Sequence, residues 1–265
     1  MLAAMQQRDF MRPGIIGIVN DEANADYWGT MAALAGMGYA GVEGRADALL
    51  EGDVAANVKR LNDLGLRLLT TGAGLDRLRD DLDEVVRQAA QLRVDRVACW
   101  WSACDSRDGL LRDCDTLDAA GERLAGEGVR LCYHHHDHEF RRTFGGARAI
   151  DLMMANTAAA NLGVIVDLAW VAIGGADPAE TVRQLGDRVA SLHVKDARPA
   201  RRDADGNVAW TAVGTGDVDL VGGCRAAMEL GVEWAVVEQD KPRRVTGLDL
   251  ARASLLNLRE LDVIE

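Results

Sequence analysis

The sequence predicts an α/β protein, a closed (β/α)8 barrel of the TIM type, from three observations. Eight short apolar runs rich in Val, Ile and Leu recur along the chain, as expected of parallel strands that are buried on both faces. Amphipathic helical stretches separate the runs, and no second composition regime interrupts them. The length of 265 residues is typical of one such barrel. We therefore expect a single barrel domain over residues 1–265.

The order of the expected elements follows from these runs. The eight expected strands are Ile15–Val19, Tyr39–Glu43, Arg67–Thr71, Arg96–Trp100, Val129–Tyr133, Val164–Asp167, Ala190–His193 and Trp234–Glu238. After the second, Val54, Val58 and Leu61 recur at helical spacing, and a longer stripe of the same kind runs from Leu75 to Leu92. Asp177 and Pro178 are typical of a helix start. The long connection Ala197–Asp217 lies where a barrel places loops over its catalytic face.

Composition narrows the function classes. The net charge of −12 disfavours nucleic acid and an anionic membrane surface as partners, since both require basic patches. The five cysteines are odd in number and lack C-x-x-C spacing, which indicates reduced thiols rather than disulfides. Met1–Gly14 carries no long apolar run, so neither a signal peptide nor an anchor is expected. We expect a cytoplasmic enzyme without nucleic-acid or membrane partners, and a homo-oligomer is compatible with the sequence.

Residues that can bind a metal ion gather at four successive expected strand ends. The fifth strand is followed by the His134–His136 run and Glu139, the sixth ends in Asp167, the seventh in His193 and the eighth in Glu238. Active sites of such barrels lie at the carboxyl ends of the strands. Carboxylates together with imidazoles suit one divalent ion, which could be Mn²⁺, Mg²⁺, Co²⁺ or Zn²⁺. The pattern therefore predicts a metal-dependent enzyme.

Four segments at these strand ends carry a resemblance to a known family. They are YHHHDHEF, VDLAW with GGADP shortly after it, SLHVKD and VVEQD. They resemble the sugar-phosphate isomerase/epimerase family of xylose-isomerase-like barrels, whose superfamily also includes inosose dehydratases and AP endonucleases. The resemblance covers the chain from about Gly14 onward and is strongest from the fifth strand.

The resemblance implies one ion, with Mn²⁺ as first choice, held by an acidic residue of strand five together with Asp167, His193 and Glu238. Glu139 is the expected strand-five ligand, and His134 is the alternative because it stands at the strand end itself. The implied catalytic residues are Glu238, Glu139, His136 and Lys195. The expected substrate contacts are His136, Trp170, Lys195, Glu43 and Trp100.

Several of these residues also have structural interpretations. Glu43 could instead pair with Arg45, Lys195 could pair with Asp196, and the tryptophans could serve packing alone. A run of histidines can be a solvated loop, but the agreement of three other strand ends favours a functional one.

The function implied is a sugar or keto-sugar isomerase or epimerase of carbohydrate metabolism, which removes a proton next to a carbonyl held by the metal. The alternative is a dehydratase or lyase acting on a keto-polyol or keto-glycoside, as in inosose dehydratases. DNA repair of the AP-endonuclease type is disfavoured because it needs more histidines and a basic face. A non-catalytic sugar-binding barrel is disfavoured, because it would lack some of the expected metal ligands, and here all of them are present.

Overall fold

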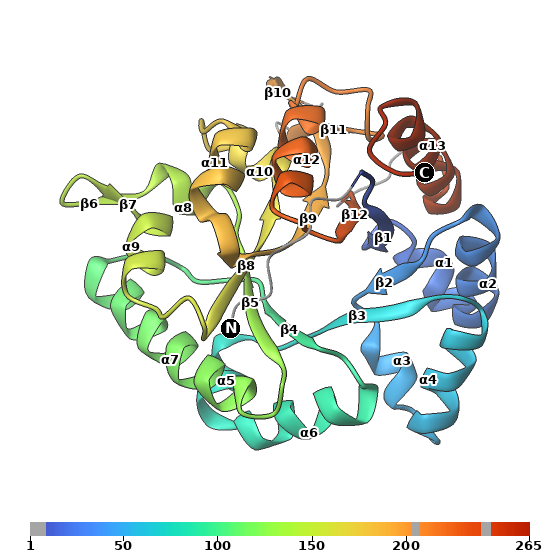
Figure 1. Cartoon of the computed structure of the whole chain (residues 1–265), viewed down its shortest axis with the longest axis horizontal. Coiled ribbons are helices and arrows are strands. Elements are labelled where there is room, and N and C mark those ends of the chain that lie inside the picture. Colours follow the sequence, from blue (N-terminus) through green and yellow to red (C-terminus); the bar gives the residue numbers. More distant parts are fainter. Residues whose placement is uncertain (1–8, 203–206, 240–244) are drawn as a thin grey trace.

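The computed structural model describes residues 9–202, 207–239 and 245–265, and these form a closed parallel barrel surrounded by helices (Figure 1). Around the barrel the strands follow the order β1-β12-β9-β8-β5-β4-β3-β2, and β2 pairs with β1 to close it. The predicted fold class is confirmed. The strands are β1 (Arg12–Ile16), β2 (Gly41–Glu43), β3 (Arg67–Gly72), β4 (Arg96–Cys99), β5 (Arg130–His134), β8 (Leu162–Asp167), β9 (Val189–Val194) and β12 (Trp234–Glu238).

The helices lie outside the barrel, as predicted. They are α1 (Asn20–Ala25), α2 (Tyr27–Met37), α3 (Ala46–Leu50), α4 (Val54–Asp63), α5 (Leu75–Asp80), α6 (Leu82–Leu92), α7 (Arg107–Ala125), α8 (His138–Arg141), α9 (Ala149–Ala155), α10 (Leu168–Ile173), α11 (Pro178–Leu185), the 3₁₀ turn η1 (Gly186–Arg188), α12 (Leu220–Glu229) and α13 (Gly247–Glu260). Asp177 caps α11 by accepting a hydrogen bond from the Glu180 amide at 2.8 Å. No helix in the described ranges is both long and apolar enough to cross a membrane.

Several predicted bounds differ by one or two residues, and two predicted elements differ more. The first strand was expected at Ile15–Val19, but β1 begins at Arg12, whose guanidinium lies 4.4 Å from the centre of the Trp234 ring. It ends before Gly17, which adopts φ +78°. The stripe from Leu75 to Leu92 was expected to be one helix, but Asp81 (φ −142°, ψ 36°) divides it into α5 and α6.

Alternating side chains fill the barrel interior and then line its open end. Along β12, Trp234 and Val236 pack with Leu69 inside the barrel, and two residues further Glu238 lines the cavity at the carboxyl end. Gly41 makes room for this packing, since a Cβ there would lie 2.8 Å from Leu69 and Trp234 atoms. On β12, the last inward position is therefore the one that reaches the cavity.

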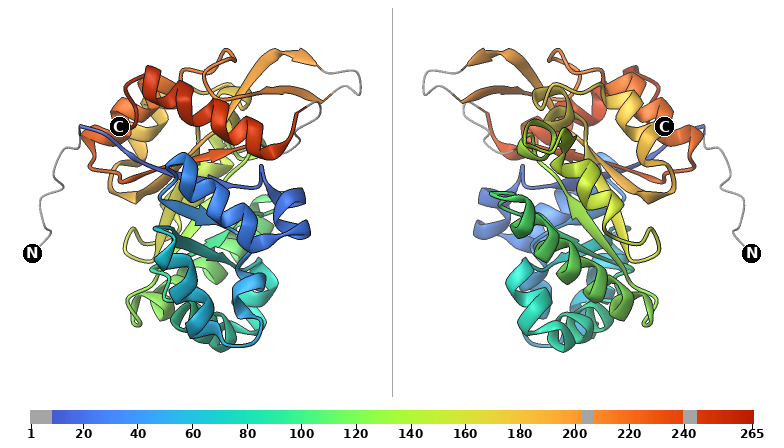
Figure 2. Two further views of the ribbon diagram at one scale, coloured as in Figure 1. Left: turned by 90° about the vertical axis from the view of Figure 1, so that its right-hand side faces the viewer. Right: turned by 90° about the vertical axis from the view of Figure 1, so that its left-hand side faces the viewer.

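A hairpin forms within the long connection expected after the seventh strand. The strands β10 (Asp196–Arg202) and β11 (Val208–Thr211) pair antiparallel, and Figure 2 shows them in orange, projecting beyond the barrel. Residues 203–206 of that connection lie outside the described part. A second small hairpin, β6 (Thr143–Phe144) with β7 (Ala147–Arg148), follows α8.

The buried carboxylate of Asp196 anchors the β10–β11 hairpin to the barrel. Its Oδ2 accepts hydrogen bonds from the amides of Gly214 (3.0 Å) and Gly216 (2.7 Å), and its Oδ1 from those of Ala197 (2.8 Å) and Val218 (3.4 Å). Burial raises the pKa of Asp196, and the four amides partly offset this effect. Gly214 and Gly216 therefore serve this turn.

Candidate metal and substrate site

A cavity of about 230 Å³ opens at the carboxyl ends of the barrel strands. One part of its wall is apolar and comes from β1, β3 and β4, and the other part carries imidazoles and carboxylates. The lining residues are Ile16, Glu43, Gly44, Thr70, Gly72, Ala98, Trp100, His134, His136, Ile165, His193 and Glu238. Several residues predicted from the sequence thus meet in one cavity.

Four side chains in and beside this cavity converge on one point. His134, Asp167, His193 and Glu238 each offer one ligand atom, and these atoms all lie within 4.8 Å of one another. Each of the four residues also has a buried atom without a hydrogen-bond partner. These atoms are His134 Nδ1, Asp167 Oδ2, His193 Nδ1 and Glu238 Oε2. The last two lie 2.8 Å apart as an ion pair, and Asp167 Oδ2 lies 3.9 Å from the Lys195 ammonium. Buried imidazoles and carboxylates that meet at one point with incompletely satisfied atoms fit a divalent cation with mixed nitrogen and oxygen ligands.

The charges around this point favour a cation. Burial disfavours a charged imidazole, but the carboxylates of Glu238 and Glu43 outweigh this effect and raise the pKa of His193 to about 10. Burial likewise raises the pKa of Asp167 to about 7, in spite of the nearby Lys195 ammonium. His134 has its pKa well below the usual value because it is buried and faces His193. It is therefore neutral, which is the form that binds metals.

Lys195 lies fully buried beside the cluster. Its ammonium is 3.3 Å from Glu238 Oε1 and 3.9 Å from Asp167 Oδ2. The same ammonium lies 4.9 Å from the ring centre of Trp170 and 4.4 Å from that of Trp210. The sequence also left open a pair between Lys195 and Asp196. The Asp196 carboxylate instead accepts hydrogen bonds from the four amides at the base of the hairpin. Trp210 was not among the expected site residues, because its hairpin brings it there from beyond the predicted strands.

The strand-five residues separate into two groups. Glu139, the first choice from the sequence, is fully buried on α8 and accepts hydrogen bonds from the Tyr133 hydroxyl (2.6 Å) and the His136 amide (2.9 Å). It also lies 3.3 Å from His138 Nδ1. The structure brings His134, and not Glu139, to Asp167, His193 and Glu238. Glu139 stands five residues beyond the strand end, where its carboxylate holds the turn that follows β5.

The residues expected to contact the substrate differ in whether they line the cavity. Trp100 is 47% exposed, and its ring lies against Gly72, where a Cβ would come within 2.1 Å of the ring. His136 lines the cavity, and its Nδ1 is buried without a partner. Trp170 does not line the cavity but packs against His136 at 5.5 Å between ring centres.

Glu43 faces His193 across the barrel mouth. Its Oε2 lies 2.9 Å from His193 Nε2, and both side chains are at most 3% exposed. The sequence left open a salt bridge between Glu43 and Arg45. In the structure Arg45 instead lies 3.4 Å from Asp47 and also binds Asn24. The sequence could flag Glu43 as a strand-end acid, but not this contact with strand seven.

Residues 31–261 match the family model described as the xylose isomerase-like TIM barrel, and the chain belongs to this family. Among the structures similar to it is a sugar phosphate isomerase/epimerase from Parabacteroides distasonis, at 19% identity, TM-score 0.79 and 96% coverage of both chains. Another is the IOLI protein with a bound zinc atom, at 15% identity and TM-score 0.72, covering 95% of this chain and 97% of that one. These two show the fold.

Among curated proteins, the chain is similar to the inosose dehydratase of Lacticaseibacillus casei. The two are 26% identical over 137 residues, which are 47% of this chain and 45% of the dehydratase. The chain thus spans about half the length of the curated relatives that it matches. The relatives are enzymes of the isomerase, epimerase and dehydratase kinds.

Proposed function

We propose that this protein is a divalent-metal-dependent enzyme of a small sugar or keto-sugar, which removes a proton from the carbon next to a carbonyl. The observation that carries the proposal is the convergence of ligand atoms from His134, Asp167, His193 and Glu238, which all lie within 4.8 Å of one another at the end of the barrel. The zinc atom in the IOLI protein supports a metal in this fold. We keep Mn²⁺ as first choice, with Zn²⁺, Co²⁺ and Mg²⁺ as alternatives. The ion would act as a Lewis acid that polarises the carbonyl and stabilises the developing oxyanion.

Glu238 is the proposed base. Its side chain is 12% exposed and lines the cavity, whereas Asp167 is fully buried and does not. Burial opposes the charge of Glu238, but Lys195 and His193 more than compensate and hold its pKa well below the usual value. The carboxylate is therefore ionised at neutral pH and can accept a proton. Lys195, held against Glu238 Oε1, keeps that carboxylate in place.

The rest of the cavity fits a small hydroxylated substrate. Its volume of about 230 Å³ is below the roughly 300–1,000 Å³ of sites for drug-sized ligands. Two atoms of lining residues, His136 Nδ1 and Glu43 Oε1, are buried without partners and can bind substrate hydroxyls. Trp100 offers a flat apolar face to the C–H side of a sugar.

The geometry favours reactions that need one base. The proton taken by Glu238 can return to the neighbouring carbon, which is an isomerisation, or leave with a β-hydroxyl as water, which is a dehydration. Epimerisation by two metal-bound glutamates would need a carboxylate at the end of strand five, where this chain has His134. The inosose dehydratases among its relatives support dehydration as the second candidate.

Solvent exchange tests this proposal. Candidate keto-sugars and keto-polyols are incubated in D₂O with enzyme and Mn²⁺, and deuterium at the carbon next to the carbonyl is followed by NMR. We expect exchange that disappears in Glu238→Gln and persists in Glu233→Gln, a control at the other end of the barrel, where Glu233 pairs with Arg12. Loss of water from the product identifies a dehydratase. Turnover of a substrate with neither exchange nor a primary deuterium isotope effect at that carbon would exclude proton abstraction and indicate a hydrolytic site.

A further inference from the structure

The inference concerns which nitrogen of His193 carries a proton. A neutral imidazole has one N–H and one lone pair, and a metal ion binds the lone pair. In the proposed metal site the ligand atom is Nδ1, which lies 2.8 Å from Glu238 Oε2, an atom of another proposed ligand. The other nitrogen, Nε2, lies 2.9 Å from Glu43 Oε2. With the ion on Nδ1 beside Glu238, the one remaining ring proton lies on Nε2, where the Glu43 carboxylate accepts its hydrogen bond and orients the ring.

The position of Glu43 makes this contact a built feature of the barrel. Glu43 is the last residue of β2, where the register with β3 shifts between Val42 and Glu43. Gly44 then turns the chain away with φ +73°. The carboxylate is thereby directed inward, with a side chain that is 1% exposed. A buried carboxylate is costly unless it is paired, and the partner here is His193.

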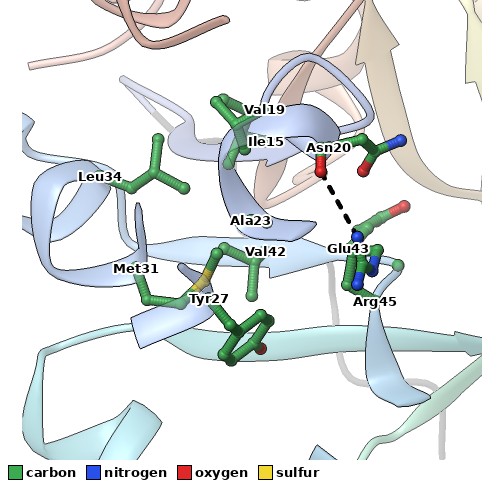
Figure 3. Close-up of a pocket in the computed structure, with 11 residues that line it drawn as sticks. Ile15, Val19, Asn20, Ala23, Tyr27, Met31, Leu34, Val42, Glu43 and Arg45 are labelled. Atoms are coloured by element: carbon green, nitrogen blue, oxygen red, sulfur yellow. Dashed lines mark hydrogen bonds between the residues drawn. The ribbon is translucent and has the colours of Figure 1, made fainter. Parts of the chain in front are cut away.

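Arg45, two residues after Glu43, provides a control for this assignment. Figure 3 shows Arg45 beside Glu43 at the rim of a small pocket, reaching toward the backbone oxygen of Asn20, to which it donates a hydrogen bond of 3.5 Å. Its other contacts go to Asn24 and Asp47. Arg45 thus offers a neighbouring charged residue that lies outside the metal cavity and can serve as a control.

We propose that Glu43 is a positioning residue, which orients His193 and fixes its tautomer for metal binding. The proposal rests on the proposed metal site. Outer carboxylates of this kind typically contribute about 10-fold to 100-fold to metal affinity. Removing Glu43 should therefore weaken the metal without removing any of the four ligands.

The test measures Co²⁺ affinity by competition with a chromophoric chelator, without any substrate. We expect Glu43→Ala to lose about 10-fold to 100-fold in affinity. Glu43→Gln, which keeps an acceptor oxygen, should lose less, and Arg45→Gln should bind like the wild type. NMR of the Zn²⁺-loaded protein gives a second readout. The His193 Nε2–H proton should be protected from solvent in the wild type and Glu43→Gln, and exchange rapidly in Glu43→Ala.

The outcomes separate the two proposals. Wild-type protein that binds no Co²⁺ would overturn the metal site and this inference together. Tight wild-type binding with unchanged affinity in Glu43→Ala would overturn the role of Glu43 alone. If Glu43→Ala does not fold, the wild-type NMR experiment still decides, because a proton on Nδ1 or an unprotected Nε2–H in the loaded protein would contradict the proposal.

Discussion

Lys195 is a fully buried cation between two tryptophan rings and two carboxylates. The position is costly for an ammonium unless opposite charges compensate it, and Asp167 and Glu238 do so. In return, Lys195 partly neutralises the two carboxylates of the cluster, Asp167 and Glu238. The residue therefore links the charge balance of the site to the stability of the barrel.

Replacement of Lys195 by methionine, which keeps the apolar stem, should destabilise the protein by about 3–5 kcal/mol in the presence of a chelator. The loss arises because Asp167 and Glu238 remain buried without their cation. Saturating Zn²⁺ should recover part of this loss, since the ion supplies positive charge to the same carboxylates. Urea unfolding with and without metal measures both effects. An equal loss in the two conditions would show that Lys195 does not share its carboxylates with the metal.

The strand-five ligand can be assigned by two substitutions. His134→Ala should lower Zn²⁺ affinity by at least tenfold, because it removes one of four proposed ligands. Glu139→Gln should retain the metal but lower the midpoint of thermal unfolding, because the Tyr133 hydroxyl and the His136 amide lose a charged acceptor. Metal titration and calorimetry check the pair. The reverse result would restore Glu139 as the ligand.

Much of this residue-level arrangement follows from a period of two along a strand. Trp234, Val236 and Glu238 alternate inward, so the strand-end acid could be predicted to reach the cavity. The role of Glu139 could not, because it lies on a short helix whose direction the strand pattern does not define. The contact of Glu43 with His193 also escaped the sequence, since it joins strands on different sides of the barrel.

At the scale of elements, the β10–β11 hairpin is the main departure from a plain barrel. It contributes Trp210 to the packing of Lys195, and one carboxylate, Asp196, holds its base through four amides. The sequence indicated a long connection here but no strands. Its alternation is short and rich in arginine, which obscures the apolar signal that identifies a strand.

Replacement of Asp196 by asparagine should loosen this hairpin. The amide nitrogen of asparagine cannot accept hydrogen bonds, so some of the four amides lose their partner, and each bond to a charged acceptor contributes about 1.5–3 kcal/mol. We expect faster hydrogen exchange at residues 212–218, measured by mass spectrometry, with little change in α6 on another part of the barrel. Unchanged protection at 212–218 would show that the hairpin is held by its tryptophan contacts instead.

At the scale of the whole molecule, the fold was predictable because it repeats. Each apolar run is followed by a helical stretch, and eight repeats close a barrel, so an error at one boundary does not alter the result. The start of β1 was predicted three residues too late, but β1 still pairs with β12 and closes the barrel. Its register joins Arg12 to Trp234 and Ile16 to Glu238. The cysteines also agree with the prediction of reduced thiols, since all five are free and buried.

The pairing of β1 with β12 has a consequence for how the chain is made. On a ribosome β12 emerges after all the other strands of the barrel, so one edge of β1 stays without its neighbour until then. Until then, the hydrogen-bonding groups of that edge are open to other strands. The half-built sheet has no closed mouth, and β12 brings Glu238 together with the strand that completes the ring. Closure of the ring and completion of the proposed ligand set thus both wait for the same strand.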